Sequence, residues 1–443
     1  MSAGRRVQVR ARRAASALAL VLIAAGAARA NDAIAIVGGT VHTLAGPAIE
    51  EGVVLVRGET IAAVGRNVAV PDGARVIDAS GQLVVPGFFD AMSTLGLSEI
   101  GSLSATQDAV ELGAFNPHLV AIEAVHPASE HLPVARSNGV THAGAAPGGS
   151  GYGIAGRASA IHLDGWTVEE MVIARDLGVV VSWPTLITRR YDRATARFAD
   201  RPFAEARKEY DERVGEIRAW LDAARRYATA LGAAEGDGPA PDLRLAGLAS
   251  VVAGRQPLLV RADRERQLRD AVAFAEKESL RLVLVGGKDA WRLADLLAEK
   301  RIAVILGPAQ ALPPREDDPY DRGYTVARDL RAAGVPIAIS TFGASAAFSL
   351  PYEAAQAVAF GLPWEDGLRA ITRWPAEILG LDDRIGTLEP GKVANLIVTD
   401  GDPLEIRTRV THVLVRGRVV ELENKHTRSY ERYRARPLPA RSE

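Results

Sequence analysis

Hydrophobic runs and turn residues alternate along the 443-residue chain in two different rhythms. In the first rhythm, near the N-terminus, short β-branched runs follow one another closely, and the turns between them are rich in glycine, proline and aspartate. This pattern is typical of strands joined as hairpins. The predicted strands are residues 33–37, 52–57, 60–64 and 76–78. The predicted turns are Gly38-Gly39, Gly58-Glu59 and Pro71-Asp72-Gly73.

The second rhythm begins at residue 83, where apolar runs alternate with helical stretches. Eight such runs predict an α/β fold of the (β/α)8 or TIM-barrel type. The runs are residues 84–91, 139–145, 158–163, 178–183, 257–263, 280–285, 303–306 and 336–341. An insertion around 185–245 separates the fourth run from the fifth. Its charged, amphipathic stretch 203–231 predicts a helix on the surface or over the barrel mouth, and we favour an insertion without function.

Strand patterns return near the C-terminus, at residues 395–398 and 412–420. Strands that precede and follow a barrel can meet in one small sheet. We therefore expect a composite β-sandwich built from 31–82 and 386–422, with the barrel at 83–385. The remaining segment, 423–443, is rich in arginine and proline and is predicted to be a flexible tail.

The first thirty residues have the order of a secretory signal peptide. Arginines precede an apolar run at 14–28, which ends in the small-x-small signal Ala28-Arg29-Ala30. The run is too short and too rich in alanine to favour a membrane anchor. We expect cleavage near Ala30 and an exported protein, periplasmic or secreted, with no membrane span in the mature chain.

Charge and cysteine content exclude several classes of function. Residues 1–30 carry six arginines and no acidic residue, so their removal takes the formal net charge from −1 to −7. This charge argues against a nucleic-acid partner. The chain has no cysteine, which excludes disulfides, a thiolate nucleophile and thiolate metal ligands.

The most informative motif is the hydrophobic stretch 84–94, which contains Pro-Gly-Phe-Phe-Asp and ends in Met-Ser-Thr. It resembles the first barrel strand of the amidohydrolase superfamily, in which Pro-Gly-Phe-x-Asp leads into a His-x-His metal pair. In this chain the histidine positions are Met92 and Thr94. A thioether is too soft, and a hydroxyl binds too weakly, to replace imidazole at a zinc-type ion.

Three further segments resemble the same superfamily in the same order. Residues 365–381 are similar to its last barrel helix, 386–398 to the following strand motif, and 413–420 to the closing hairpin. Asn395 stands where the family prefers aspartate. Several spaced motifs in the right order are a specific signal. The resemblance covers roughly residues 33–421 and is strongest to the imidazolonepropionase-related branch.

The resemblance implies a hydrolase of carbon–nitrogen bonds other than peptide bonds, with one or two divalent ions such as zinc. The metal lowers the pKa of a bound water, and an aspartate after the eighth strand accepts its proton. This chain departs from the implied ligands at nearly every position. The corresponding residues, which we expect to line the pocket, are Met92, Thr94, Arg261, Gly286 and Phe342. We therefore predict no metal and no other cofactor.

Other residues are candidates for ligand binding: Asp90, Arg261, Asp263, His142 and His162. A guanidinium at the position of Arg261 would repel a divalent cation and could hold an anion. The interpretation we favour is an internal ion pair of Arg261 with Asp263 or Asp90. The two histidines could approach the barrel mouth, although a lone histidine is more often structural, and no two histidines have metal-ligand spacing.

These observations predict an exported amidohydrolase-family protein that is metal-free and catalytically silent or weakened. Its role would be to bind a small-molecule or anionic ligand, or to act as partner to an active amidohydrolase paralogue. The alternative is an active hydrolase of a cyclic amide or dipeptide-like substrate that uses an unconventional site. The resemblance also implies a homodimer.

Overall fold

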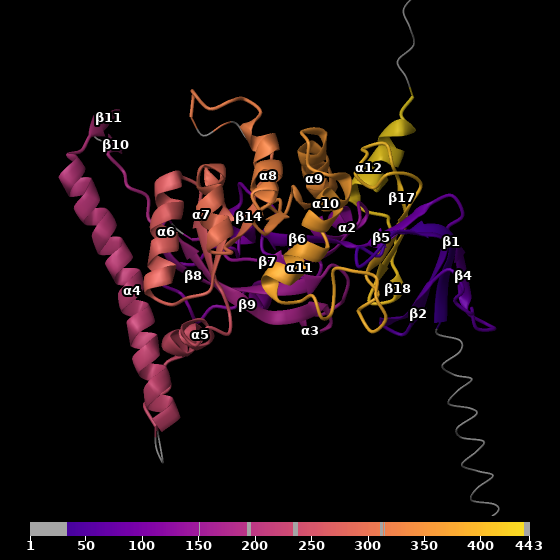
Figure 1. Ribbon diagram of the computed structural model, residues 1–443, viewed down its shortest axis with the longest axis horizontal. Helices are drawn as coiled ribbons and strands as arrows, with labels where there is room; N and C mark the ends of the chain where they lie inside the picture. Colours follow the sequence, from indigo (N-terminus) through magenta and orange to yellow (C-terminus); the bar gives the residue numbers. More distant parts are fainter. Residues whose placement is uncertain are drawn as a thin grey trace, which may run out of the picture.

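A computed structural model describes residues 33–149, 151–192, 196–233, 238–310, 313 and 315–437. The predicted signal peptide and its cleavage site lie outside these residues. Within them, every helix is too short or too polar to cross a membrane. Figure 1 shows a barrel flanked at one end by a small sheet domain and at the other by the long helix α4 (Phe203–Ala233).

The small domain is an eight-stranded sheet made from both ends of the chain. Its order is β18-β17-β16-β5-β1-β2-β3, with β4 paired to β1. The two ends meet where β5 pairs antiparallel with β16, and Val85 lies opposite Ile397. The predicted composite sheet is therefore confirmed. Its strands are β1 (Ala33–Val41), β2 (Ile49–Arg57), β3 (Thr60–Gly65), β4 (Arg75–Asp78), β5 (Leu83–Pro86), β16 (Leu396–Thr399), β17 (Val410–Val415) and β18 (Arg418–Val419).

One local prediction for this domain was wrong. Gly38-Gly39 is not a turn but lies inside β1, where the pairing with β2 shifts register and Gly38 has φ 80°. Glycine allows such a bulge without ending the strand. Within the predicted tail 423–443, the structure places the helix α12 (Lys425–Arg434). Asn424 caps this helix by accepting from the amides of His426 and Thr427.

The barrel is a second eight-stranded sheet, and each strand overlaps one of the eight predicted runs, which confirms the TIM-barrel prediction. The first run divides between two sheets, since β5 ends at Pro86 and the barrel begins at Phe88. The barrel strands, in order of pairing, are β6 (Phe88–Ser93), β7 (Val140–Ala145), β8 (Gly153–His162), β9 (Val172–Ser182), β12 (Leu258–Ala262), β13 (Leu282–Gly286), β14 (Ala303–Leu306) and β15 (Ile337–Ile339).

One strand departs from the expected pattern, because β8 runs antiparallel to both β7 and β9. A parallel crossover needs a dozen or more residues. The connection 146–152 is too short for one and allows only a reversal of direction. Between β8 and β9 the described helix is the short α3 (Val168–Met171). The C-terminal end of β8, at His162, therefore lies at the opposite end of the barrel from the C-terminal ends of the parallel strands.

Side chains close the barrel between its first and last strands. The ladders between described strands run from β6 to β15 without joining these two. The Ser340 hydroxyl, just after β15, accepts from the Met92 amide at 3.0 Å and lies 2.8 Å from the Met92 carbonyl oxygen. The Thr341 amide donates to the Asp90 carboxylate at 3.0 Å. These bonds across the seam take the place of a backbone ladder.

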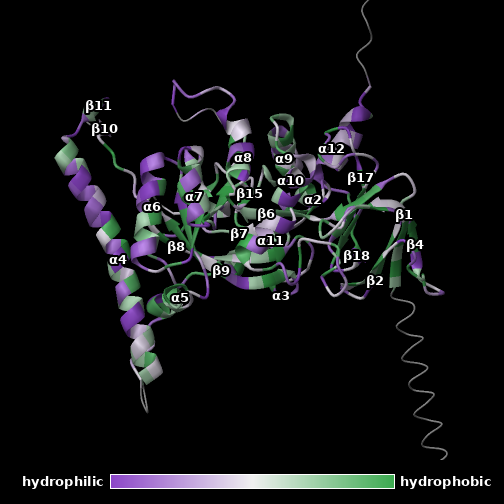
Figure 2. Ribbon diagram, in the orientation of Figure 1, coloured by the Kyte–Doolittle hydropathy of each residue, from purple (hydrophilic) through white to green (hydrophobic). Residues whose placement is uncertain are grey.

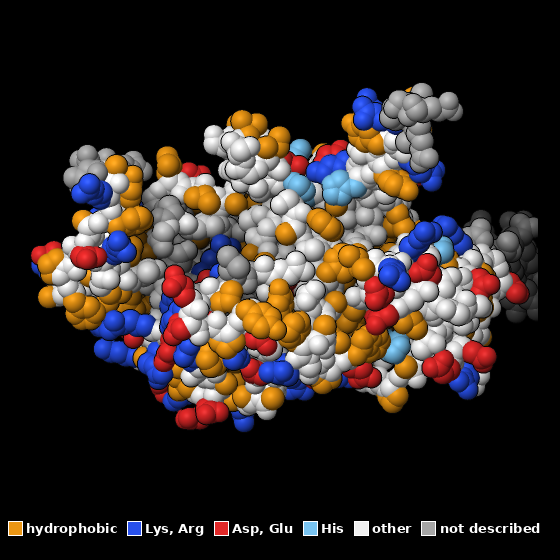
Figure 3. Space-filling view, turned by 90° about the horizontal axis from the view of Figure 1, so that it is seen from above, with side chains coloured by type: hydrophobic (Ala, Val, Ile, Leu, Met, Phe, Trp, Pro, Cys, Tyr) orange, Lys and Arg blue, Asp and Glu red, His pale blue; other side chains and the backbone are white. Residues whose placement is uncertain are grey.

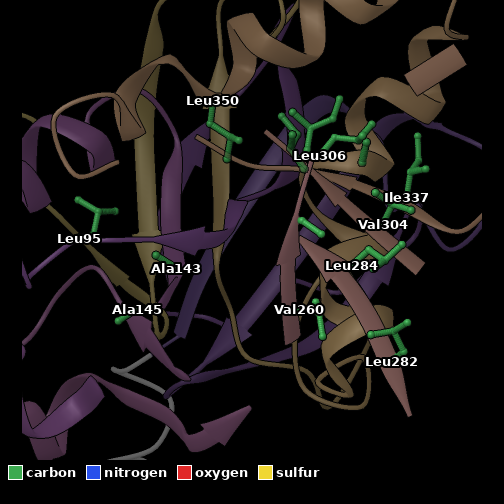
Figure 4. Close-up of a cluster of buried hydrophobic side chains, with 14 of the residues drawn as sticks. Leu95, Ala143, Ala145, Val260, Leu282, Leu284, Val304, Leu306, Ile337 and Leu350 are labelled. Carbon is green, nitrogen blue, oxygen red and sulfur yellow. The ribbon is translucent and has the colours of Figure 1, made fainter. Parts of the chain in front are cut away.

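Two layers of apolar side chains hold the barrel together. Alternate residues along a barrel strand face inward and outward. Val260, Leu284, Val304 and Ile337 pack in the layer between strands and helices (Figure 4). Their neighbours on the same strands, such as Leu259, belong to the cluster inside the barrel. In Figure 2 the strands are mainly hydrophobic, and the helices carry hydrophilic residues.

Helices and short elements surround this core. The helices after the insertion are α6 (Glu265–Lys277), α7 (Ala294–Glu299), α8 (Arg322–Ala332), α9 (Leu350–Ala359), α10 (Trp364–Ala370) and α11 (Arg373–Leu379). Earlier in the chain lies α2 (His131–Arg136), and the single turns of 3-10 helix are Ser104–Thr106, Ala121–Ala124, Ala290–Leu293 and Ala347–Ser349.

The insertion contains the hairpin β10 (Arg189–Asp192) and β11 (Arg197–Asp200), then α4 and α5 (Leu243–Val252). Helix α4 stands where the sequence predicts a helix, along the side of the barrel rather than over its mouth (Figure 1). Its Tyr210 hydroxyl donates to Asp270 of α6 at 2.7 Å and accepts from the Trp183 indole at 2.9 Å. Hydrophobic and basic side chains gather at this end of the molecule (Figure 3).

Candidate ligand site at the barrel mouth

A cavity of about 550 Å³ opens where the parallel strands end. Its wall is formed by the residues that end or follow β9, β12, β13, β14 and β15. They include Trp183, Arg261, Asp263, Gly286, Leu306 and Phe342. Strands β12 and β13 are in register here, with Arg261 opposite Val285 and Ala262 opposite Gly286. The C-terminal face of a TIM barrel is where this fold builds its sites, and the volume suits a small molecule.

The five predicted metal-ligand positions divide into two groups. Arg261, Gly286 and Phe342 line the cavity. Met92 does not line it, and packs fully buried with the apolar side chains inside the barrel. Thr94 does not line it either, and its hydroxyl accepts from the Ala344 amide at 3.0 Å. The prediction that all five line the pocket is therefore wrong for Met92 and Thr94.

The side chains at these positions do not fit a metal ion. At Gly286, φ is +107° and an added Cβ would lie 2.6 Å from the Asp263 Oδ1, so Asp263 occupies the space that a ligand side chain would need. Phe342 packs its ring over Gly307, where an added Cβ would lie 2.6 Å from a ring carbon. Among the described residues, no three histidine, aspartate or glutamate side chains are grouped so that they could hold a metal.

Arg261 carries a charge that no carboxylate of the described residues neutralises. The ion pairs closer than 4.0 Å do not include Arg261, so the predicted pair with Asp263 or Asp90 is wrong. Its Nε is buried without a hydrogen-bond partner, and burial lowers the pKa of the guanidinium. An arginine stays protonated in proteins even so. A positive charge therefore stands in the cavity wall at the position of the fifth-strand ligand.

Three other charged residues surround the cavity: Asp263, Lys288 and Arg322. Arg322 is paired with Asp329 at 2.7 Å, and its guanidinium lies over the Trp291 ring. Lys288 is exposed at the rim. The Lys288 amide donates to the Asp263 carboxylate at 3.4 Å. Sequence reasoning did not place Lys288 or Arg322 in the site, because both come from loops and helix starts whose course the strand pattern does not define.

Asp90 is fully buried and does not line the cavity. Its carboxylate accepts from the Thr341 amide and from the hydroxyls of Ser340 and Thr341. Burial raises its pKa to about 6 despite these bonds. The Ser340 hydroxyl has one proton and two oxygen neighbours, Asp90 and the Met92 carbonyl, so it donates to only one of them at a time. The residue predicted to bind a ligand instead closes the barrel seam.

His142 and His162 lie together, opposite each other on β7 and β8, but away from the cavity. The amide nitrogen of Asn395 is 3.1 Å from Nδ1 of His162 and 3.4 Å from Nδ1 of His142. Burial lowers the pKa of His142 to about 3 and that of His162 well below its usual value. Both imidazoles are thus neutral, and they join the barrel to β16 rather than face a ligand.

Comparison with known proteins shows related chains. A family model described as "Amidohydrolase family" matches residues 357–421. Imidazolonepropionase of Rhizorhabdus wittichii is 44% identical over 86 residues, which are 18% of this chain and 22% of that protein. Imidazolonepropionase of Chromobacterium violaceum is 38% identical over 124 residues, which are 27% of this chain and 28% of that protein. These matches thus span less than a third of either relative.

A solved structure matches almost the whole chain. The amidohydrolase from Thermotoga maritima MSB8 is 27% identical, with a TM-score of 0.75, and the alignment covers 88% of this chain and 99% of that one. The barrel, the composite sheet and the order of the elements along the chain are therefore shared with that structure.

Proposed function

Because the chain belongs to the amidohydrolase superfamily, whose members hydrolyse carbon–nitrogen bonds, but carries at its barrel mouth a cation that no described carboxylate pairs with, we propose that it is a metal-free, catalytically silent or weakened member that binds a small molecule. The observation that carries this proposal is the uncompensated charge of Arg261. A unit charge and a dication 4 Å apart repel by roughly 8 kcal/mol at an effective dielectric constant of 20.

The open cavity favours ligand binding over a role as the silent partner of an active paralogue. Loss of the ligand side chains has not led to collapse of the mouth, which keeps about 550 Å³. Its wall combines apolar groups, such as Leu306 and Phe342, with a few polar ones, which is the usual make-up of a small-molecule site. A protein that acted only by contact with a paralogue would not need this space.

Export is part of the proposal. The arginines and the apolar run before Ala30 support cleavage near that residue, and a periplasmic or secreted location.

Metal content tests the proposal. Protein recovered from the periplasm of an expressing host is incubated with zinc and manganese, desalted and measured by elemental analysis, and its N-terminal residue is read to check cleavage near Ala30. We expect less than about 0.1 equivalent of metal, because ligand side chains are missing and Arg261 repels cations. One or two equivalents would overturn the metal-free proposal. The variant Arg261→His, measured in parallel, is also expected to stay metal-free because Gly286 and Phe342 supply no ligand.

A second candidate function is hydrolysis of a cyclic amide or dipeptide-like substrate at an unconventional site. It is favoured by Asp263, a carboxylate in the cavity wall beside Arg261. A carboxylate there could serve as general base and a guanidinium could stabilise an oxyanion. Turnover of such a substrate that is lost in Asp263→Asn would support this function against the silent one.

A further inference from the structure

The starting point is the contrast between Arg261 and the other arginines near the cavity. Arg322 is paired with Asp329, Arg292 with Asp318 and Arg315 with Asp289. Arg261 has no such partner among the described residues. Its side chain is partly buried, its Nε is enclosed without a hydrogen-bond partner, and it lines the cavity.

A cation that is partly buried and unpaired is costly, and proteins normally pair such groups. The wall itself does not supply the missing charge. Asp263 and Lys288 have opposite signs and offset each other, while Arg322 is already neutralised by Asp329. One negative charge is therefore needed to balance the wall. A second would be repelled by Asp263.

The other residues of the cavity wall indicate the chemistry of the rest of the ligand, to which the anionic group is attached. Val285, Leu306 and Phe342 present apolar surface to the same cavity as Arg261. A cavity of about 550 Å³ has room for a body of this apolar kind in addition to the anionic group.

We propose that the barrel mouth binds a small monocarboxylate with an apolar body, with the carboxylate on Arg261 and the body against Phe342, Leu306 and Val285. This inference rests on the proposed ligand-binding function and names the ligand class. A guanidinium forms two parallel, charge-assisted hydrogen bonds with a carboxylate, which a neutral amide with its single acceptor oxygen does not match.

The test uses two probes that differ only in charge: 4-phenylbutyrate and 4-phenylbutyramide. Each is titrated calorimetrically into the full mature protein. We expect the acid to bind at least about tenfold more tightly than the amide, since a charge-assisted pair contributes 1.4 kcal/mol or more. In Arg261→Met this preference should disappear. Inorganic phosphate should compete poorly, because its second charge faces Asp263.

The matched control is Arg281→Met, which removes an arginine that lines a different cavity at the N-terminal ends of the strands. This variant should keep the preference for the acid. A thermal melt checks folding: Arg261→Met should melt no lower than the wild type, because it removes an unpaired, partly buried charge.

Three results would overturn the monocarboxylate. They are equal binding of acid and amide by the wild type, a preference that survives in Arg261→Met, and binding of neither probe. Displacement of the acid by equimolar phosphate would also overturn it, because the site would then not be specific for carboxylates. None of these results bears on metal content, whereas one equivalent of bound metal would overturn the proposed function instead.

Discussion

At the scale of the residue, the side chains that stand in place of the family's metal ligands are complementary to their neighbours. Gly286 leaves room for the Asp263 carboxylate, and its φ of +107° is a conformation that side-chain-bearing residues rarely adopt. Phe342 has φ 60°, which costs a non-glycine residue roughly 1–2 kcal/mol, and its ring covers Gly307. The mouth is therefore rebuilt around new contacts, and restoring a single metal ligand would disturb them.

Gly286→Ala tests this complementarity. The new Cβ would lie 2.6 Å from Asp263 Oδ1 and 3.0 Å from the Ala262 oxygen, in addition to the strain of a positive φ. We expect a loss of roughly 2–3 kcal/mol in the free energy of unfolding, measured by urea denaturation. Gly254→Ala is the matched control, because Gly254 has φ +68° with open space around it and should lose only the strain of about 1 kcal/mol. Equal losses in the two variants would show that Asp263 does not restrict position 286.

The sequence identified part of the site because the family motifs show which residues stand at the C-terminal end of each strand. That alignment placed Arg261, Gly286 and Phe342 in the wall, where they lie. The same alignment could not show that Met92 and Thr94 do not line the cavity. Their orientation depends on bonds to Ser340 and Ala344, which are about 250 residues away and are brought near only when the barrel closes.

At the scale of the element, strand positions were predictable, but strand direction was not. Buried strands appear as apolar runs whichever way they point. The direction of β8 depends on the short connection 146–152, and this connection reverses the chain. Because β8 is reversed, His162 lies with His142 at the far end of the barrel. The prediction that these histidines approach the mouth therefore fails for a topological reason.

The seam between β6 and β15 is an element-scale feature that Ser340→Ala should weaken. The substitution leaves the buried Met92 amide and the Asp90 carboxyl without their hydroxyl partner. Each unsatisfied buried group costs about 1–3 kcal/mol, so we expect a comparable fall in the free energy of unfolding. Hydrogen exchange should also be faster in these two strands. Ser349→Ala, which removes only a local bond to Ala346, should have a much smaller effect, and a loss as large as that of Ser340→Ala would count against the seam.

At the scale of the whole molecule, the barrel and the composite sheet are joined by a buried polar contact. The Asn395 side chain reaches both histidines with its nitrogen and accepts from the Arg416 amide with its oxygen at 2.9 Å. A neutral amide at this position suits neutral imidazoles, whereas the family's preferred aspartate would favour a charged one. The sequence showed the substitution but not its partners, because β7, β8 and β16 meet only in the folded chain.

The junction predicts how stability depends on pH. The folded-state pKa of His142 is lowered to about 3, so the unfolded chain binds the proton more readily, and stability present above pH 6.5 is lost as the pH falls toward 3. Asp90 has the opposite sign: its pKa is raised to about 6, so its contribution is lost as the pH rises from about 4 to 6. Between these limits the two partly cancel, and the histidine dominates because its shift is larger and His162 shifts in the same direction.

The variant His142→Leu separates the two contributions. We expect the free energy of unfolding, measured with urea, to fall between pH 7 and pH 5 in the wild type. In the variant this fall should be smaller by roughly 1–2 kcal/mol, because one histidine fewer takes up a proton on unfolding. His126→Gln, at an exposed histidine, should keep the wild-type difference. If His142→Leu also kept it, acid would be acting elsewhere. A reduced difference would instead identify the contact between the barrel and the composite sheet as the part of the molecule that acid weakens first.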